Sequence, residues 1–273
     1  ALLPPQVHIF SLYSTPELSL VVGNIFSAMA SPKKRIFPVL KEKLRISASA
    51  VDFVFSSDKK LAYQPGQYME WTLAHDDADI RGNRRYFTLA SSPTEPDLRL
   101  GVRFFEKGSS YKKALLAIGK DAPIVAAHVM GDFTLPKDPN QKLVFIAGGI
   151  GITPFRSMLK YLLDSNEKRD IILLYALNNF EEIVYKDVLE AARNQLGIST
   201  IYFIANAARN MPENFVRQGY INTEASQQLV PDYHERTFYI SGSHQMVLSV
   251  EGNLAELHVA KRQIKVDYFP GYD

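Results

Sequence analysis

A glycine-rich turn, residues 147–154 (AGGIGITP), contains the residue types that point most directly to ligand binding. It follows the hydrophobic run KLVFIA and precedes a segment of helical periodicity. Glycines let the backbone turn tightly and approach a ligand. Thr153 and Pro154 suit the N-cap and the first position of a helix, whose free amides attract anions. The turn therefore predicts an anion site or, alternatively, a plain strand-to-helix connection. Its candidate binding residues are Gly148, Gly149, Gly151 and Thr153.

Neither of the common phosphate-binding patterns fits this turn. Counted from Gly149, the sixth position of G-x-G-x-x-G is Pro154, and the G-K-[ST] ending of a P-loop is missing. The turn alone leaves the class of anion open.

A second set of candidates lies upstream. Arg85 belongs to the segment RRYFTLASSP, and Gly108, Ser109 and Ser110 precede a short helix expected over residues 112–118. A guanidinium pairs with phosphate through a fork of donors, and a serine-rich helix start adds hydroxyls and amides. These residues could clamp one pyrophosphate. Taken singly, they are also compatible with a strand-edge arginine and an ordinary capped helix.

Two kinds of element must position these residues. Residues 43–135 contain short runs of period two separated by turns: LRISASAVDFVF, QYMEWTL, RRYFTLA, LRLGVRFF and APIVAAHV. This spacing predicts an antiparallel barrel or sandwich. From residue 142 the runs KLVFIA, DIILLYAL, STIYFIA and TFYIS alternate with helical segments, which predicts an α/β domain with a parallel sheet. One helical face is expected to carry Phe155, Met158, Leu159, Leu162 and Leu163.

Composition narrows the classes of function. The chain has 273 residues, 46% hydrophobic and 22% charged, with a net charge of +2 and no cysteine. This composition is typical of a folded protein of about two domains. The small net charge produces no overall electrostatic field that would attract nucleic acid. Without cysteine, disulfides, a cysteine nucleophile and resident iron-sulfur clusters are excluded, and the spacing of the six histidines predicts no metal site.

The first residues differ in character from the rest. Residues 1–32 carry one charge, Glu17, and residues 33–45 carry six basic residues against Glu42. This arrangement predicts either a partly buried arm with a solvated basic loop or a segment at the cytoplasmic face of a membrane. The start at Ala1 favours a chain cut from a longer protein. We expect an arm over residues 1–42, a barrel over 43–138 and an α/β domain over 139–273, in a cytoplasmic protein.

The order of the motifs resembles the ferredoxin-NADP reductase family over roughly residues 43–273. The order is PGQY, R-x-[aromatic]-T followed by ASSP, GSS, GDFTLP, GGxGxTP, Ser-Gly before a helix, and a terminal acidic-x-Phe. The resemblance implies a flavin-binding antiparallel barrel followed by a nicotinamide-nucleotide domain. It also implies FAD, in preference to FMN, and NADH or NADPH as substrate.

The resemblance assigns roles residue by residue. The flavin would be bound by Arg85, Tyr86, Phe87, Thr88, Val102, Phe104, Gly108, Ser109, Ser110 and Phe269, and the nucleotide by Gly148, Gly149, Gly151, Thr153 and Gly242. The catalytic residues would be Thr88, Ser241, Asp267 and Phe269. Three positions depart from the family pattern: Phe87 replaces tyrosine, Ser241 replaces cysteine and Asp267 replaces glutamate.

The implied activity is electron transfer from NAD(P)H through FAD to a one-electron acceptor. The acceptor would be an iron-sulfur protein or a membrane redox domain, located on another chain or on a segment outside this sequence. Two alternatives stay open: a flavin-binding electron relay that does not turn over nicotinamide, and an interaction domain that docks a membrane complex through residues 1–45 without any cofactor.

The terminal aromatic yields a first prediction. By resemblance, the ring of Phe269 would lie on the flavin until nicotinamide displaces it; the alternative is that it only caps the last strand. Aromatic stacking contributes about 0.5–1.5 kcal/mol beyond burial. Phe269→Ala should therefore tighten NAD(P)⁺ binding by up to about tenfold, equivalent to ~1.4 kcal/mol, as measured by titration. Unchanged or weaker affinity would exclude Phe269 as the gate and direct attention to Tyr272.

Overall fold

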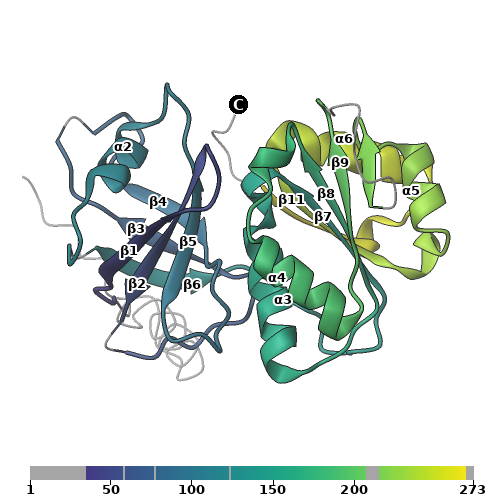
Figure 1. Cartoon of the computed structure of the whole chain (residues 1–273), viewed down its shortest axis with the longest axis horizontal. Coiled ribbons are helices and arrows are strands. Elements are labelled where there is room, and N and C mark those ends of the chain that lie inside the picture. Colours follow the sequence, from purple (N-terminus) through teal and green to yellow (C-terminus); the bar gives the residue numbers. More distant parts are fainter. Residues whose placement is uncertain (1–34, 58, 77, 123, 207–214, 269–273) are drawn as a thin grey trace, which may run out of the picture. The chain divides into compact units, whose positions relative to one another are not determined.

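The computed structural model describes residues 35–268 except 58, 77, 123 and 207–214. Its first half contains two antiparallel sheets of three strands each (Figure 1). One has the order β1 (Val39–Arg45), β2 (Ala50–Ser56) and β5 (Leu98–Arg103), and the other β4 (Arg84–Thr88), β3 (Tyr68–Thr72) and β6 (Val125–Met130). Helix α2 (Ser110–Ala117) follows β5, with the Ser109 hydroxyl accepting from the Lys112 amide as its N-cap.

The two small sheets share one hydrophobic core. Residues from both sheets meet in it, as when the rings of Phe55 and Trp71 lie 5.2 Å apart. Strands β4 and β5 are edge strands of different sheets and do not pair with each other. The barrel is therefore split between the strand that carries Arg85 and Thr88 and the strand that carries Val102.

Two details differ from the sequence expectation. The run LRISASAVDFVF is a hairpin rather than one strand, because the amides of Ile46 and Ser47 both donate to the Ala50 carbonyl and reverse the chain between β1 and β2. Strand β1 begins at Val39, so the expected boundary after residue 42 falls inside a strand.

The second half is a six-stranded parallel sheet with the order β10-β9-β8-β7-β11-β12. Its strands are β7 (Leu143–Gly148), β8 (Ile171–Leu177), β9 (Thr200–Ile204), β10 (Val216–Gln218), β11 (Thr237–Gly242) and β12 (Ile264–Tyr268). The connecting helices are α3 (Thr153–Ser165), α4 (Lys186–Ala191), α5 (Thr223–Leu229) and α6 (His244–Glu256). The short helical turns are η1 (Gly149–Ile152), η2 (Phe180–Glu182), η3 (Ala192–Leu196), η4 (Tyr233–Glu235) and η5 (Lys261–Gln263). The expected fold class, an antiparallel barrel followed by an α/β domain, is confirmed.

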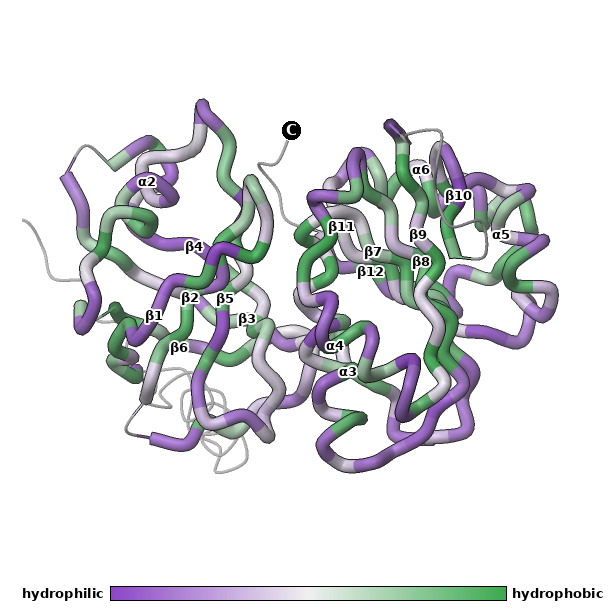
Figure 2. The backbone as a smooth tube through the Cα atoms, viewed as in Figure 1, coloured by the Kyte–Doolittle hydropathy of each residue, from purple (hydrophilic) through white to green (hydrophobic). Residues whose placement is uncertain are grey.

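Alternation along the parallel strands divides this core into two layers. Phe145 packs with Phe155 of α3 on one face of the sheet, whereas Val144 and Ile146 pack with α6 on the other. Figure 2 shows hydrophobic residues along the parallel strands and hydrophilic residues on the outside of the helices. Because both faces are covered, the strands are continuously hydrophobic, as expected for parallel sheets.

Helix α3 begins differently from the prediction. Thr153 is not an N-cap: it is the first residue of α3, and the preceding 3-10 turn η1 leads the chain directly into the helix without a side-chain cap. Pro154 lies in the first turn, where its missing amide costs nothing. The expected apolar face is confirmed, with Phe155, Met158 and the leucines packed on the sheet.

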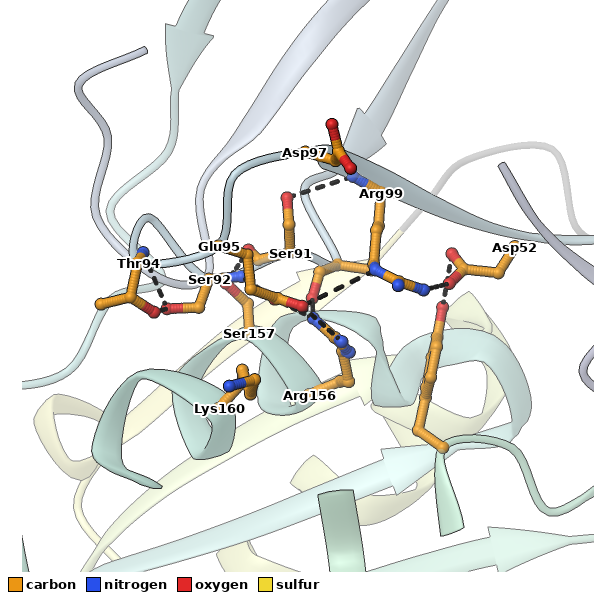
Figure 3. A network of polar contacts seen from close by, with 12 residues as sticks. Asp52, Ser91, Ser92, Thr94, Glu95, Asp97, Arg99, Arg156, Ser157 and Lys160 are labelled. Carbon is orange, nitrogen blue, oxygen red and sulfur yellow. Dashed lines mark hydrogen bonds and ion pairs between the residues drawn. The ribbon is translucent and has the colours of Figure 1, made fainter. Parts of the chain in front are cut away.

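A buried polar network joins α3 to the loop after β4 (Figure 3). Arg156, 4% exposed, donates to both carboxylate oxygens of Glu95 and, at 2.9 Å, to the Ala90 carbonyl. The Ser157 hydroxyl donates to the Ser91 carbonyl at 2.5 Å. Two segments distant in sequence are thereby fixed to each other.

Within the described part of the chain, no helix is both long and apolar enough to cross a bilayer.

The network predicts a large stability effect at Arg156. Arg156→Met removes the nearest cationic partner of the largely buried Glu95 carboxylate and leaves it the Ser92 amide and the more distant Arg99, and breaking a buried pair costs about 3–5 kcal/mol. The matched control is Lys160→Met, which lies one turn further along α3 and removes only an ion pair with Asp164 near the surface, a change worth less than about 1 kcal/mol. Urea unfolding measures both variants. Equal stabilities would show that the Arg156 network does not hold the fold together.

Candidate functional site

The order of strands in the parallel sheet defines the position of the site. The chain runs outward from β7 through β8 and β9 on one side, then returns to place β11 and β12 on the other. Ligands of open α/β sheets bind at the carboxyl ends of the strands where the order reverses. Here these ends carry Gly148 on β7 and Ser241 with Gly242 on β11.

The glycine turn needs glycine at two positions for different reasons. A Cβ on Gly151 would lie 2.4 Å from the Ser241 carbonyl oxygen, so no side chain fits between the turn and β11. Gly149 has a φ of +53°, in the left-handed region that favours glycine, and its backbone faces a cavity. The turn thus combines close packing at Gly151 with an open backbone at Gly149.

A cavity of about 550 Å³ opens in front of this turn. Of the expected nucleotide-binding residues, Gly148 and Gly149 line it, whereas Gly151, Thr153 and Gly242 are buried and are not among its lining residues. The other lining residues include Asn178, Tyr220, Ser243, Gln245 and Met246. Among the described residues that line this cavity, two are charged: Arg103 and Glu182. The cavity has the size expected of a cofactor or ligand pocket.

Three of the expected catalytic residues bear polar atoms without partners. Thr88 Oγ1, Ser241 Oγ and Asp267 Oδ2 are buried and make no hydrogen bond to the described residues. Ser241 lies opposite Asp267 in the β11–β12 pairing, and the Thr88 hydroxyl is close enough to Asp267 to lower the pKa of its carboxyl. Because buried polar groups normally have partners, this cluster fits a ligand that supplies donors and acceptors. A flavin ring edge is such a ligand.

Asp267 has an altered acidity. Burial raises the pKa of Asp267 to about 6; the Thr88 hydroxyl opposes the rise and the Asp132 carboxylate adds to it. A second cavity, of about 300 Å³, is lined by Asp267, Asp132, Tyr68, Tyr86 and Tyr268 among others. A carboxyl with this pKa can hold or release a proton near neutral pH.

Arg85 is already engaged by an acidic neighbour. Its Nη2 donates to both Asp79 oxygens at 3.0 and 3.2 Å, and Nη1 donates to the carbonyls of Arg81, Gly82 and Arg84. Burial opposes the shift, but the hydrogen bonds from Arg81 and the charge of Arg85 lower the pKa of Asp79 to about 2. A phosphate bound to Arg85 would therefore replace a carboxylate.

The same segment engages the second expected phosphate anchor. The Ser110 hydroxyl accepts from the Asp79 amide at 3.0 Å and lies 3.1 Å from His75 Nε2. Ser109 caps α2, and the Gly108 amide donates to the Phe105 carbonyl. The structure thus connects Arg85 and Ser110 through one residue, Asp79.

The expected aromatic contacts are distributed over two faces of β4. Phe87 points into the barrel core, where its ring lies 5.9 Å from that of Tyr111. Tyr86 is half exposed, donates to Glu70 at 3.1 Å and lines the Asp267 cavity. Val102 is fully buried, and Phe104 lies 6.1 Å from Phe53. Phe269 lies outside the described residues.

Sequence reasoning missed Arg103, Glu182 and Asp79. Arg103 lies between the expected flavin-binding residues Val102 and Phe104, and its outward position on β5 follows from the alternation Leu100-in, Gly101-out, Val102-in. The alternation along this strand could therefore have predicted the outward position of Arg103 from the sequence. Glu182 lies in the short turn η2 and Asp79 in an irregular loop, and no periodicity predicts the side-chain direction of either.

Comparison with known proteins agrees with this geometry. Residues 145–252 match the family described as "Oxidoreductase NAD-binding domain". A flavohemoprotein of Oceanobacillus iheyensis is 24% identical over 245 residues, covering 86% of this chain and 59% of its own length. The glycine betaine monooxygenase reductase subunit of Pseudomonas aeruginosa is 25% identical over 196 residues, covering 70% and 52%. The chain thus spans little more than half the length of these relatives.

Two solved structures share the fold. The flavohem-like FAD/NAD binding domain of nitric oxide dioxygenase from Vibrio cholerae superposes with a TM-score of 0.75 at 22% identity, covering 86% of this chain and 98% of that one. A ferredoxin NADP⁺ reductase from Neisseria gonorrhoeae with bound FAD and NADP gives 0.71 at 16% identity, covering 86% and 98%. Both support the arrangement of a barrel followed by a parallel sheet.

The acidity of Asp267 predicts a pH-dependent stability. A carboxyl whose pKa is higher in the folded chain than in the unfolded chain favours folding at low pH, and this contribution is lost as the pH rises through about 6. In protein freed of any bound cofactor, Asp267→Asn should therefore gain stability relative to the unsubstituted chain between pH 4 and 7, on the order of 1 kcal/mol. Urea unfolding at several pH values measures this gain. A constant difference across this range would contradict the raised pKa.

Proposed function

Because the chain belongs to the ferredoxin-NADP reductase family, we propose that it takes electrons from NAD(P)H and passes them through FAD to a one-electron acceptor. The observation that carries the proposal is the cluster of buried, unpartnered polar atoms on Thr88, Ser241 and Asp267. It lies at the carboxyl end of β11, against which the glycine turn packs through Gly151. Polar atoms awaiting a ligand and a turn suited to a pyrophosphate are thus adjacent.

FAD, when bound, would supply the conversion between a hydride and single electrons. The protein would contribute binding, orientation and proton management. Arg85 and the start of α2 would hold the flavin pyrophosphate, with Arg85 exchanging the Asp79 carboxylate for phosphate. Thr88 and Ser241 would offer hydroxyls to polar atoms of the ring. Asp267, with its pKa of about 6, would hold a proton nearby.

The substrate site would be the cavity in front of Gly148 and Gly149. This cavity and the Asp267 cavity have no lining residue in common. The nucleotide pyrophosphate would lie on the amides of the glycine turn, where a helix start favours negative charge. Ser241 is buried beside Gly151, and this burial would keep water away from the point where the nicotinamide would meet the flavin. The choice between NADH and NADPH is left to measurement.

The acceptor would be a redox protein or domain outside residues 1–273. One relative is named as the reductase subunit of glycine betaine monooxygenase and another as a flavohemoprotein, and both names are compatible with such an acceptor. The proposed membrane attachment concerns residues 1–45, of which residues 1–34 lie outside the described part of the chain and residues 39–45 form strand β1. It stays a prediction from sequence.

The first experiment is a visible spectrum of the purified chain, with the released cofactor identified, followed by rapid mixing with NADH and with NADPH. The proposal expects FAD and its bleaching by at least one nucleotide. A flavin that neither nucleotide bleaches would favour the relay alternative, and a protein that neither contains nor binds flavin would overturn the proposal.

Gly149→Val separates the two sites. A valine at a φ of +53° is strained, and its Cβ would approach Arg103 Nη1 to 3.2 Å at the cavity wall. Flavin content should be retained, whereas the rate of reduction by NAD(P)H should fall by about tenfold or more. A tenfold fall corresponds to an increase of ~1.4 kcal/mol in the activation free energy. Arg85→Ala should instead lower the flavin content of the purified protein.

The matched control is Gly252→Val in α6, where an added Cβ meets nothing within 4 Å. It should change neither flavin content nor reduction. If Gly149→Val is folded and is reduced as fast as the control, the nucleotide does not bind on this turn.

A further inference from the structure

Asp79 contacts both of the phosphate anchors that were expected from the sequence. Its carboxylate accepts from Arg85 Nη2 through both oxygens, at 3.0 and 3.2 Å. Its amide donates to the Ser110 hydroxyl at 3.0 Å. One residue thus engages the guanidinium and the hydroxyl that are proposed to hold the flavin pyrophosphate, and it brings a negative charge to the guanidinium.

Arg85 is also held by contacts that do not involve the Asp79 carboxylate. Its Cζ lies 5.2 Å from the centroid of the buried Tyr111 ring, and its Nη1 donates to three neighbouring backbone carbonyls. A carboxylate and a phosphate both pair with a guanidinium through charge-assisted hydrogen bonds. One anion can therefore replace the other while Arg85 keeps its position.

Residues 79–82, here called the Asp79 turn, bury little apolar surface. Ile80 is fully exposed, the Arg81 side chain is half exposed, and a Cβ added to Gly82 would meet nothing within 4 Å. Polar contacts close the turn instead: the Gly82 amide donates to the Asp79 carbonyl at 2.7 Å, and the Arg81 amide donates to the Asp79 carboxylate at 3.0 Å. Segments with few buried apolar contacts open at a low cost in free energy.

The surroundings of Asp79 are positively charged. Burial lowers the pKa of Lys112 to about 8, and the charges of Arg81, Arg103 and Arg85 lower it further, so these four cations lie near one another. Asp79 forms ion pairs with two of them, Arg81 and Arg85. A group of cations attracts an anion. Asp79 thus supplies negative charge where a bound phosphate would also supply it.

We propose that the Asp79 carboxylate is an intrachain competitor of the flavin pyrophosphate, which pairs with Arg85 before FAD binds and is displaced when FAD binds. This inference rests on the proposed function and deepens it, because it concerns how the flavin site is filled. Asp79 would stabilise the chain before FAD is taken up, and its return to Arg85 would assist release of FAD. FAD binding would therefore be weaker and more readily reversible than the two phosphate anchors alone would make it.

The test compares Asp79→Asn with the unsubstituted chain, both freed of flavin and then titrated with FAD. Asn keeps the size of the side chain and removes its charge, so FAD should bind about twofold to fivefold more tightly, as expected for loss of a partly exposed ion pair. The thermal stability of the flavin-free variant should fall, because Arg85 loses its counterion. A merely structural role for Asp79 would lower both the stability and the affinity, so the opposite signs of the two changes identify a competitor.

The matched control is Asp76→Asn, which removes the same charge three positions earlier, where Asp76 is exposed. Its Kd for FAD should equal that of the unsubstituted chain. Asp79→Glu, which keeps the charge, should also retain the weaker binding. If Asp79→Asn binds FAD no more tightly than the control does, the inference is wrong, whereas FAD binding and nucleotide-driven reduction of the unsubstituted chain would leave the proposed function standing.

Hydrogen exchange of the unsubstituted chain keeps the test decisive if Asp79→Asn folds poorly. Addition of FAD should accelerate exchange of the Asp79 amide, because the Ser110 hydroxyl that accepts from it would turn to the flavin phosphate. Unchanged or slower exchange of this amide in the FAD-bound chain would overturn the inference. If neither the unsubstituted chain nor Asp79→Asn binds FAD, the proposed function fails as well, which distinguishes that outcome from the failure of the Asp79 inference alone.

Discussion

The buried contact between Arg156 and Glu95 determines how the two candidate sites relate to each other. Arg156 lies in the first turn of α3, three residues after Thr153, and Glu95 follows the segment that carries Thr88. One guanidinium thereby fixes both the helix that begins at the glycine turn and the loop that continues from the flavin motif. A second bond, from Ser157 to Ser91, prevents rotation about the first. This buried network therefore joins the barrel to the parallel sheet, together with the ion pair between Arg103 and Glu182.

The sequence predicted the elements of the fold better than their side-chain partners. Periodicity indicated the β3 to β9 strands and the apolar face of α3, because burial on one or both faces imposes a repeat that is visible locally. The start of α3 was wrong, since Thr153 is a good N-cap in isolation and only the preceding 3-10 turn makes it helical. The hairpin at residues 46–49 was also missed, because ISAS contains no Gly, Pro, Asn or Asp, and its two serines are weaker turn signals.

The site was predicted in part, through the order of its motifs. Thr88, Ser241 and Asp267 lie close together in the structure, although Thr88 and Ser241 are 153 positions apart in sequence. The ion pairs around them were not predicted: Arg103 meets Glu182 across 79 residues, and Asp79 reaches Arg85 from an irregular loop. Such pairs depend on the packing of whole elements, and no local pattern encodes them. The alternation of side chains along a strand does predict that Phe87 and Tyr86 lie on opposite faces of β4.

The strand order has a consequence for how the molecule is made. Central strand β7 pairs on one side with β8, which follows soon after, and on the other with β11, where Thr237 lies opposite Leu143. The second pairing closes a long loop of chain, and such non-local contacts form slowly. During synthesis, the barrel and the β7–β8 pair can be complete while Ser241 and Asp267 are still inside the ribosome. The cofactor-facing cluster is therefore among the last parts to assemble, and a nascent chain exposes the edge of β7 until the final strands arrive.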